Sequence, residues 1–378
     1  MTVDQNVSQE KGPFSYENWK AANIGMPSAT AFEYPFFTDA HIVGDHIFEG
    51  LGPYQLINAV ALPEVRQFRP SLVLHAKEHS DSKLPNMTET DDSRYHGGNL
   101  ADEIASIISL CLGIRLKSGG ANRIFGIGGD PKGLPTSSWG YTQDPVLPTL
   151  SKPPVIPQAL GIHHLKNIVI LETFPSLSLE NSIALVRATR LYQEAIWIAE
   201  STPELSWIML VSAVETVANR WRTAIEMPID RLRASRPELE DILRGQGNDK
   251  FVASVAEQIA PYMGATKKFI DFVLEFLPPP PKERPTEAGQ HSWTKSAIKK
   301  TMGKIYSYRS RALHGGHPFP APMCQAPQGF GGGIEEIPLG LATSMQGAVW
   351  LAKDTPMLLH TFEYIVRQTI LKWWESQV

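Results

Sequence analysis

An arginine and a histidine stand five residues apart near the end of a helical pattern, at Arg309 and His314. Arginine stays charged at every physiological pH, whereas the imidazole of histidine gains or loses a proton near neutrality. Cleavage of a phosphodiester needs both properties, because one group must move a proton and another must stabilise the charge that develops on phosphorus. These two residues are therefore the candidate chemical centre of the chain.

The spacing alone decides little, since the same loose pattern recurs at Arg69–His75, Arg284–His291 and Arg311–His317. The context separates Arg309 from these others. Residues 291–308 carry apolar side chains at helical spacing, and Gly315 and Gly316 predict a helix end. Residues five apart on a continuous helix point about 140° away from each other. Gly315, Gly316 and Pro318 indicate where the helix must stop, and we expect this end to let His314 turn back toward Arg309.

The motif closes a basic stretch. Residues 282–317 contain eight lysines and arginines against two glutamates, a net charge of +6 in a chain of net charge -4. Such a local excess attracts polyanions, although the chain as a whole is not basic. The candidate polyanion-binding residues are Lys299, Lys300, Lys304, Arg311 and His317. The last two either reach a flanking phosphate or are simply exposed.

The segment Arg309-Ser310-Arg311-Ala312-Leu313-His314-Gly315 resembles the R-S-x-x-x-H-G form of the motif of HEPN domains, specifically the Apea-like group. The upstream stretch from Leu205 to Glu215 is similar to that group's apolar helix ending in Ala-x-Glu. The resemblance covers residues 180–375. HEPN domains are helical bundles that usually dimerise. Many are metal-independent endoribonucleases of toxin–antitoxin, CRISPR-linked and antiphage systems, while some only bind RNA or nucleotides.

The resemblance implies that His314 takes part in proton transfer at the ribose 2′-hydroxyl or the leaving oxygen. Arg309 would stabilise the phosphorane, and cleavage would leave a 2′,3′-cyclic phosphate. Ser310 stands where the wider family often has asparagine, and Glu215 would line the cleft and orient Arg309 or Arg311. The implied protein is a homodimer that acts on RNA in antiviral defence or as a toxin, without cofactor or metal, and its N-terminal half would meet an antitoxin or sensor partner.

Plainer interpretations stay open. Arg309 could pair with a carboxylate, while His314 satisfies a carbonyl at the helix C-terminus, where a cation is favoured. Glu215 has polar residues at helical spacing around it, which is typical of a solvated face. The main alternative function is a non-catalytic HEPN module that binds RNA or a nucleotide in regulation, and another is a structural oligomerisation protein.

Other reactive residues carry weaker signals. Asp39, His41, Asp45 and His46 could bind a metal ion, but they lack a recognised ligand spacing, and we expect no metal site. Two cysteines make no disulfide framework, and Cys111 lies in an apolar run. The glycine-rich stretches 126–130 and 329–333 do not match a phosphate-binding loop and predict flexible loops.

The length of 378 residues predicts two domains and an α+β fold overall. Residues 1–30 are expected to be a flexible lead-in, 31–175 a mixed α+β domain, and 178–378 an all-α HEPN-like bundle. In the first domain we predict strands at 68–75 and 166–171, a helix through 104–112 capped by Asn99 or Asp102, and loop over 127–160.

Further helices are predicted at 183–198, from Pro203 onward, and near 237–244, 250–262, 265–276, 291–308 and 355–375. The four prolines from 278 to 281 predict a stiff spacer. The N-terminus lacks a signal-peptide pattern, and no apolar run reaches the roughly 18 residues of a membrane span. The expected location is the cytoplasm, with no membrane contact.

Overall fold

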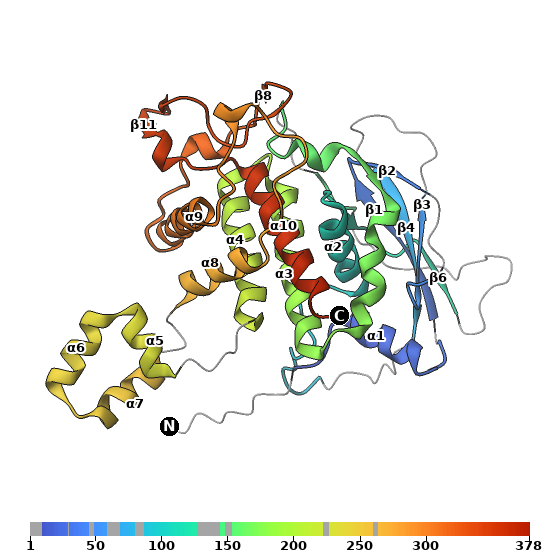
Figure 1. The fold of residues 1–378 in the computed structure, drawn as a ribbon. Helices are drawn as coiled ribbons and strands as arrows, with labels where there is room; N and C mark the ends of the chain where they lie inside the picture. Colours follow the sequence, from blue (N-terminus) through green and yellow to red (C-terminus); the bar gives the residue numbers. More distant parts are fainter. Residues whose placement is uncertain are drawn as a thin grey trace.

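The structure is a computed structural model of the 378-residue chain. It describes residues 10–28, 30–44, 49–58, 69–79, 87–126, 144–147, 153–221, 227–259 and 264–378. A sheet region leads into a larger helical region (Figure 1), so the predicted α+β class is confirmed. Among these residues, no helix combines the length and the apolar content that crossing a membrane requires.

The principal sheet is antiparallel and is ordered β3-β4-β1-β5, with β6 also paired to β1. Its strands are β1 (Thr30–Thr38), β3 (Tyr54–Asn58), β4 (Arg69–Glu78), β5 (Lys117–Ser118) and β6 (Arg123–Phe125). Alternate residues such as Phe36, Leu72 and Leu74 are fully buried, as expected of a sheet with one face on the core. β4 confirms the strand predicted at 68–75.

Two helices cover the inner side of the sheet. α2 (Leu100–Leu112) begins with the predicted cap: the side chain of Asn99 accepts from the amides of Ala101 and Asp102, and Asp102 closes a capping box. α1 (Phe14–Asn23) lies within the expected lead-in, but Tyr16 and Trp19 are buried against the core. The prediction of a loosely held lead-in is therefore wrong for this stretch, because its aromatic side chains anchor it.

The strand predicted at 166–171 is also wrong. Residues Leu165–Ser176 form a 3₁₀ helix, η2. Leu165, Ile168, Leu171 and Phe174 recur every three residues and are all buried, which is the period of a 3₁₀ helix. Just before it, β7 (Ile162–His164) pairs in parallel with β2 (His41–Val43).

The helical half begins with a tightly packed pair, α3 (Leu179–Ile198) and α4 (Pro203–Trp221). The helices that follow are α5 (Pro228–Ser235), α6 (Pro237–Gln246), α7 (Asp249–Ile259), α8 (Ala265–Glu275), α9 (Lys295–Gly315) and α10 (Leu359–Glu375). All but α5 were predicted. This half is not purely helical, because two small hairpins separate α9 from α10. They are formed by β8 (Gly329–Phe330) with β9 (Gly333–Ile334), and by β10 (Ala342–Met345) with β11 (Ala348–Leu351).

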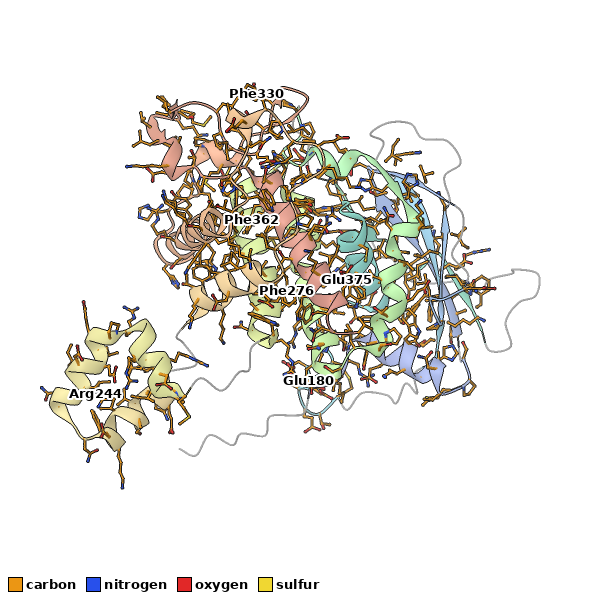
Figure 2. The ribbon with its side chains drawn as sticks, viewed as in Figure 1. Glu180, Arg244, Phe276, Phe330, Phe362 and Glu375 are labelled. Carbon is orange, nitrogen blue, oxygen red and sulfur yellow. The ribbon has the colours of Figure 1, made fainter. Side chains whose placement is uncertain are left out.

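The hydrophobic core does not stop at the expected boundary near residue 175. One cluster of buried residues runs from Tyr16 to Trp374. α2 lies between the sheet and α3 (Figure 1), and Ser106 on α2 shares a buried 2.9 Å hydrogen bond with Thr189 on α3. Side chains such as Phe362, which stacks on Trp207 at 4.7 Å, fill the bundle (Figure 2). Helices α5–α7 have a separate small cluster around Leu232.

Candidate functional site

The site residues Arg309 and His314 both lie on α9, which runs without a break from Lys295 to Gly315. The helix ends in a Schellman motif: the amide of Gly316 donates to Ala312 at 3.2 Å, and that of His317 donates to Arg311 at 3.3 Å. Gly316 has φ +65°, whereas Gly315 is still helical. The predicted helix end at the paired glycines is confirmed, but only the second glycine takes the left-handed conformation, so this end does not release His314 from the helix.

The continuous helix keeps Arg309 and His314 apart. Five helical residues correspond to a rotation of about 140° between the two side chains. The Arg309 side chain is 20% exposed and faces α4, whereas His314 is exposed on the last turn. Within one chain the structure does not bring the two groups together, and His314 does not turn back.

The structure does bring Arg309 together with Glu215. The Arg309 Nη2 atom donates to Glu215 Oε2 at 2.6 Å, and the hydroxyl of Tyr306 donates to Glu215 Oε1 at 2.7 Å. The guanidinium also lies over the Tyr306 ring, 5.6 Å from its centroid. Burial, together with the hydrogen bond to Glu215, raises the pKa of Tyr306 to about 12, so its hydroxyl stays protonated and keeps donating.

Packing of α4 on α9 explains this cluster. On α4, Leu210, Val214 and Val217 are fully buried, which leaves Glu215 at the edge of the contact. Glu215 is 16% exposed. The Arg309 Nε atom is buried, and it has no hydrogen-bond partner among the described residues. The guanidinium is thus held from one side by Glu215 and retains unused donor capacity.

The other predicted residues lie on the outer side of α9 or just beyond it. Lys299, Lys300, Arg311 and His317 are exposed, and Arg311 lies over the Tyr308 ring at 4.8 Å. By helical rotation, Lys300, Arg311 and His314 fall on one stripe, and we call Lys300, Ser307, Arg311 and His314 the outer stripe. Ser310 is half-buried between this stripe and Arg309.

Carboxylates from other parts of the chain neutralise some of the basic segment. Lys304 donates to Asp354 at 2.9 Å, and Arg284 binds Glu336 through two bonds of 2.7 and 2.6 Å. Together with the Arg309–Glu215 pair, these contacts bring three carboxylates to residues 282–317, and the net charge there falls from +6 to +3. Lys304, which was predicted to bind RNA, therefore already forms an ion pair with Asp354.

Tyr306 was not among the predicted site residues, although it stands three residues before Arg309 and therefore on the same face of the helix. Asp354 and Glu336 could not have been found, because neither is close in sequence to its partner.

Among the described residues, no three His, Cys, Asp or Glu side chains are arranged to hold a metal ion. Asp39 instead binds Arg115, and Asp45, His46 and residues 127–130 lie outside the described part of the chain. Burial raises the pKa of Cys111 to about 12, so this free thiol is unreactive.

Comparison of the chain with family models, with curated proteins and with solved structures found no match.

Proposed function

We propose that the helical half of this chain is a metal-independent endoribonuclease whose reactive site is completed by a second copy of the chain. The observation that supports the proposal is the clamp on Arg309. Glu215 and Tyr306 hold its guanidinium close to the surface, and an exposed histidine occupies the last turn of the same helix. Glu215 and Tyr306 are positioning residues in this proposal, and Arg309 and His314 are the catalytic pair.

The proposed reaction needs the second copy for a geometric reason. Arg309 and His314 of one chain point about 140° apart and cannot contact the same phosphate. A two-fold axis beside the C-terminal end of α9 would place His314 of one copy opposite Arg309 of the other. His314 would then move a proton at the 2′-hydroxyl or the leaving oxygen, and Arg309 would stabilise the charged phosphorane. The product would carry a 2′,3′-cyclic phosphate.

The outer stripe would hold the flanking RNA. Arg311 and Lys300 are exposed on the same stripe as His314 and can neutralise phosphates on either side of the reacting one. Arg309 is largely neutralised by Glu215, so attraction of the RNA depends on this stripe and on Lys299 and His317.

A second candidate function is RNA binding without cleavage. It is favoured by the same ion pair, since a guanidinium held at 2.6 Å by a carboxylate resembles a structural contact as much as a catalytic one. In that case the outer stripe alone would carry the function, and Arg309 would only join α9 to α4.

Mixing two inactive variants separates these functions. Arg309→Ala and His314→Ala should each abolish cleavage of single-stranded RNA in EDTA. If the site forms between copies, a one-to-one mixture should recover about a quarter of the wild-type rate, because half of the dimers are mixed and each carries one complete site. His164→Ala, at an exposed histidine remote from α9, is the matched control and should cleave normally.

The alternatives give different results. Activity that survives both single variants indicates a contaminating nuclease and overturns the proposal. A protein that binds RNA but never cleaves it supports the second candidate. A role as a toxin or defence effector predicts that expression arrests growth and that His314→Ala relieves the arrest.

A further inference from the structure

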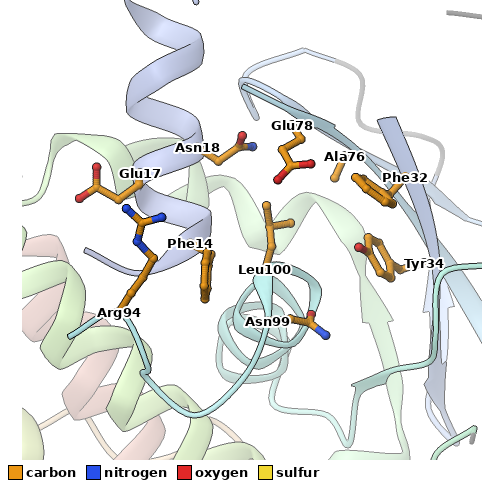
Figure 3. A pocket seen from close by; sticks show the side chains of 10 residues that line it. All are labelled: Phe14, Glu17, Asn18, Phe32, Tyr34, Ala76, Glu78, Arg94, Asn99 and Leu100. Atoms are coloured by element: carbon orange, nitrogen blue, oxygen red, sulfur yellow. The ribbon is translucent and has the colours of Figure 1, made fainter. Parts of the chain in front are cut away.

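The N-terminal half contains a cavity of about 200 Å³ between α1, the sheet and the start of α2 (Figure 3). Pockets that enclose drug-sized ligands usually measure roughly 300–1,000 Å³, so this cavity suits a smaller molecule. Its lining residues lie between Phe14 and Leu100, far in sequence from α9, and none of the residues assigned to RNA cleavage lines it.

Most of the cavity wall is apolar. Phe32 and Tyr34 of β1 stack on each other, with ring centroids 6.0 Å apart, and form one end. Phe14 of α1 and Leu100 of α2 lie in the middle (Figure 3). These side chains would bury an aromatic or branched aliphatic group and release it from water.

The opposite end carries a pair of opposite charges. Figure 3 shows Glu17 and Arg94 next to each other on the side away from Phe32 and Tyr34. The Arg94 Nε atom is buried and has no hydrogen-bond partner among the described residues, and the guanidinium lies over the Phe14 ring at 5.6 Å. Glu17 uses Oε1 to accept from the Gly12 amide at 3.1 Å, which leaves Oε2 for another donor.

We propose that this cavity binds a free α-amino acid with a large apolar side chain. The ligand carboxylate would take the unused donors of Arg94, a geometry that guanidinium groups match through two parallel hydrogen bonds. The ligand ammonium would donate to Glu17. The apolar side chain would extend over Phe14 and Leu100 to the stacked rings.

The charge distribution favours this ligand over simpler ones. A plain carboxylic acid would leave Glu17 unmatched and close to a second negative charge, and a plain amine would face Arg94. Glu78 stands at the aromatic end of the cavity (Figure 3), so an acidic side chain would be repelled there. Leucine, phenylalanine and tryptophan are therefore the expected ligands, and glutamate is not.

Calorimetric titration of the full-length protein tests the proposal with three related compounds. L-Phenylalanine should bind saturably, and phenethylamine and 3-phenylpropanoate should each bind at least about tenfold more weakly, because each lacks one charged group. Arg94→Met should make phenylalanine and phenethylamine bind equally. Glu17→Gln should make phenylalanine and 3-phenylpropanoate bind equally.

Arg187→Met is the matched control, because Arg187 is a partly exposed arginine that pairs with Glu10 and does not line the cavity. It should leave binding unchanged.

If Arg94→Met unfolds more easily than the wild type, the comparison of the three compounds on the wild-type protein decides alone. The proposal is overturned if leucine, phenylalanine and tryptophan all fail to bind at millimolar concentration, or if 3-phenylpropanoate binds as tightly as phenylalanine. RNA cleavage plays no part in these measurements, so failure here leaves the proposed nuclease untouched.

Discussion

Arg309 faces α4 and His314 faces solvent, although both belong to one unbroken helix. The position of the left-handed residue causes this separation, because α9 continues through Gly315 and ends only at Gly316. A helix that ended one turn earlier would have released the histidine. The end of α9 therefore decides that one chain alone cannot assemble the pair.

The two glycines at this end should respond to substitution in opposite ways. Gly316 has φ +65°, so Gly316→Ala forces a side chain into the left-handed region and should cost about 1 kcal/mol of unfolding free energy. Gly315→Ala adds a methyl group inside the helix, where alanine is favoured by roughly 0.5–1 kcal/mol, and this methyl group would contact the ring of His317, which is exposed. Urea denaturation of both variants checks the prediction. Equal effects of the two substitutions would contradict the described helix end.

Exposed and paired basic residues of α9 should contribute unequally to RNA binding. Arg311→Ala removes an exposed charge of the outer stripe, so it should weaken binding and lower the salt slope by about one counterion. Lys304→Ala is the comparison, since Lys304 already pairs with Asp354 and should change the slope little. Fluorescence anisotropy over a range of salt concentrations measures both. If Lys304→Ala changes the salt dependence of RNA binding more than Arg311→Ala does, the outer stripe is not the main RNA-binding surface of α9.

Arg115 should be one of the least replaceable residues of the chain. Its guanidinium is completely buried and binds Asp39 at 2.6 Å and Glu200 at 3.1 Å. Arg115→Met leaves two carboxylates buried without their cation, which should cost about 3–5 kcal/mol. Arg123→Met, at an arginine that is 44% exposed and pairs with Glu33, should cost only about 1 kcal/mol. Denaturant unfolding curves compare the two, and similar losses would refute the contrast.

Glu103 should make the stability of the protein depend on pH. This carboxyl group is fully buried on α2 and accepts from the amide of Ser15 at 2.7 Å, at the start of α1. Burial raises its pKa from 4.5 to about 7, against the opposing effect of the hydrogen bonds from Ser15 and Phe14. The native protein then binds this proton more tightly than the unfolded chain does. The contribution of Glu103 to the unfolding free energy should therefore fall as the pH rises from about 4.5 to about 7, by an amount of order 2 kcal/mol.

Glu103→Gln should remove most of that pH dependence, because the amide cannot ionise. Glu257→Gln, at an exposed carboxylate, should retain it. Thermal or urea unfolding between pH 4.5 and 8 gives the comparison. If the difference in unfolding free energy between the wild type and Glu103→Gln does not change in this direction as the pH rises through this window, the raised pKa of Glu103 is wrong.

Local signals in the sequence predicted most helices and one main strand, because periodicity and caps act over a few residues. Asn99 begins α2 as its capping pattern indicates, and the helix predicted from Pro203 onward is present as α4. The run at 166–171 was assigned to the wrong element, since a short apolar run fits either a strand or a tight helix. The buried residues Leu165, Ile168 and Leu171 recur at every third position, as in a 3₁₀ helix, and not at every second position, as in a strand.

The site was predictable in part. The expectation for Glu215 was either a solvated face or contact with Arg309 or Arg311, and the structure pairs it with Arg309, 94 residues away. The position of His314 was not, because either glycine of Gly315-Gly316 could have ended the helix. The ion pairs of Lys304 and Arg284 depend on which distant segments pack against α9, and no local pattern encodes that.

The shared core has a practical consequence for anyone who wishes to isolate the helical half. Cutting the chain after residue 175 would strip α2 from α3 and leave the hydroxyl of Thr189 without Ser106, and the amide of Gln193 without the carbonyl of Leu116. Such a fragment would expose a large apolar surface containing polar groups that have lost a hydrogen-bond partner, and it should aggregate when expressed.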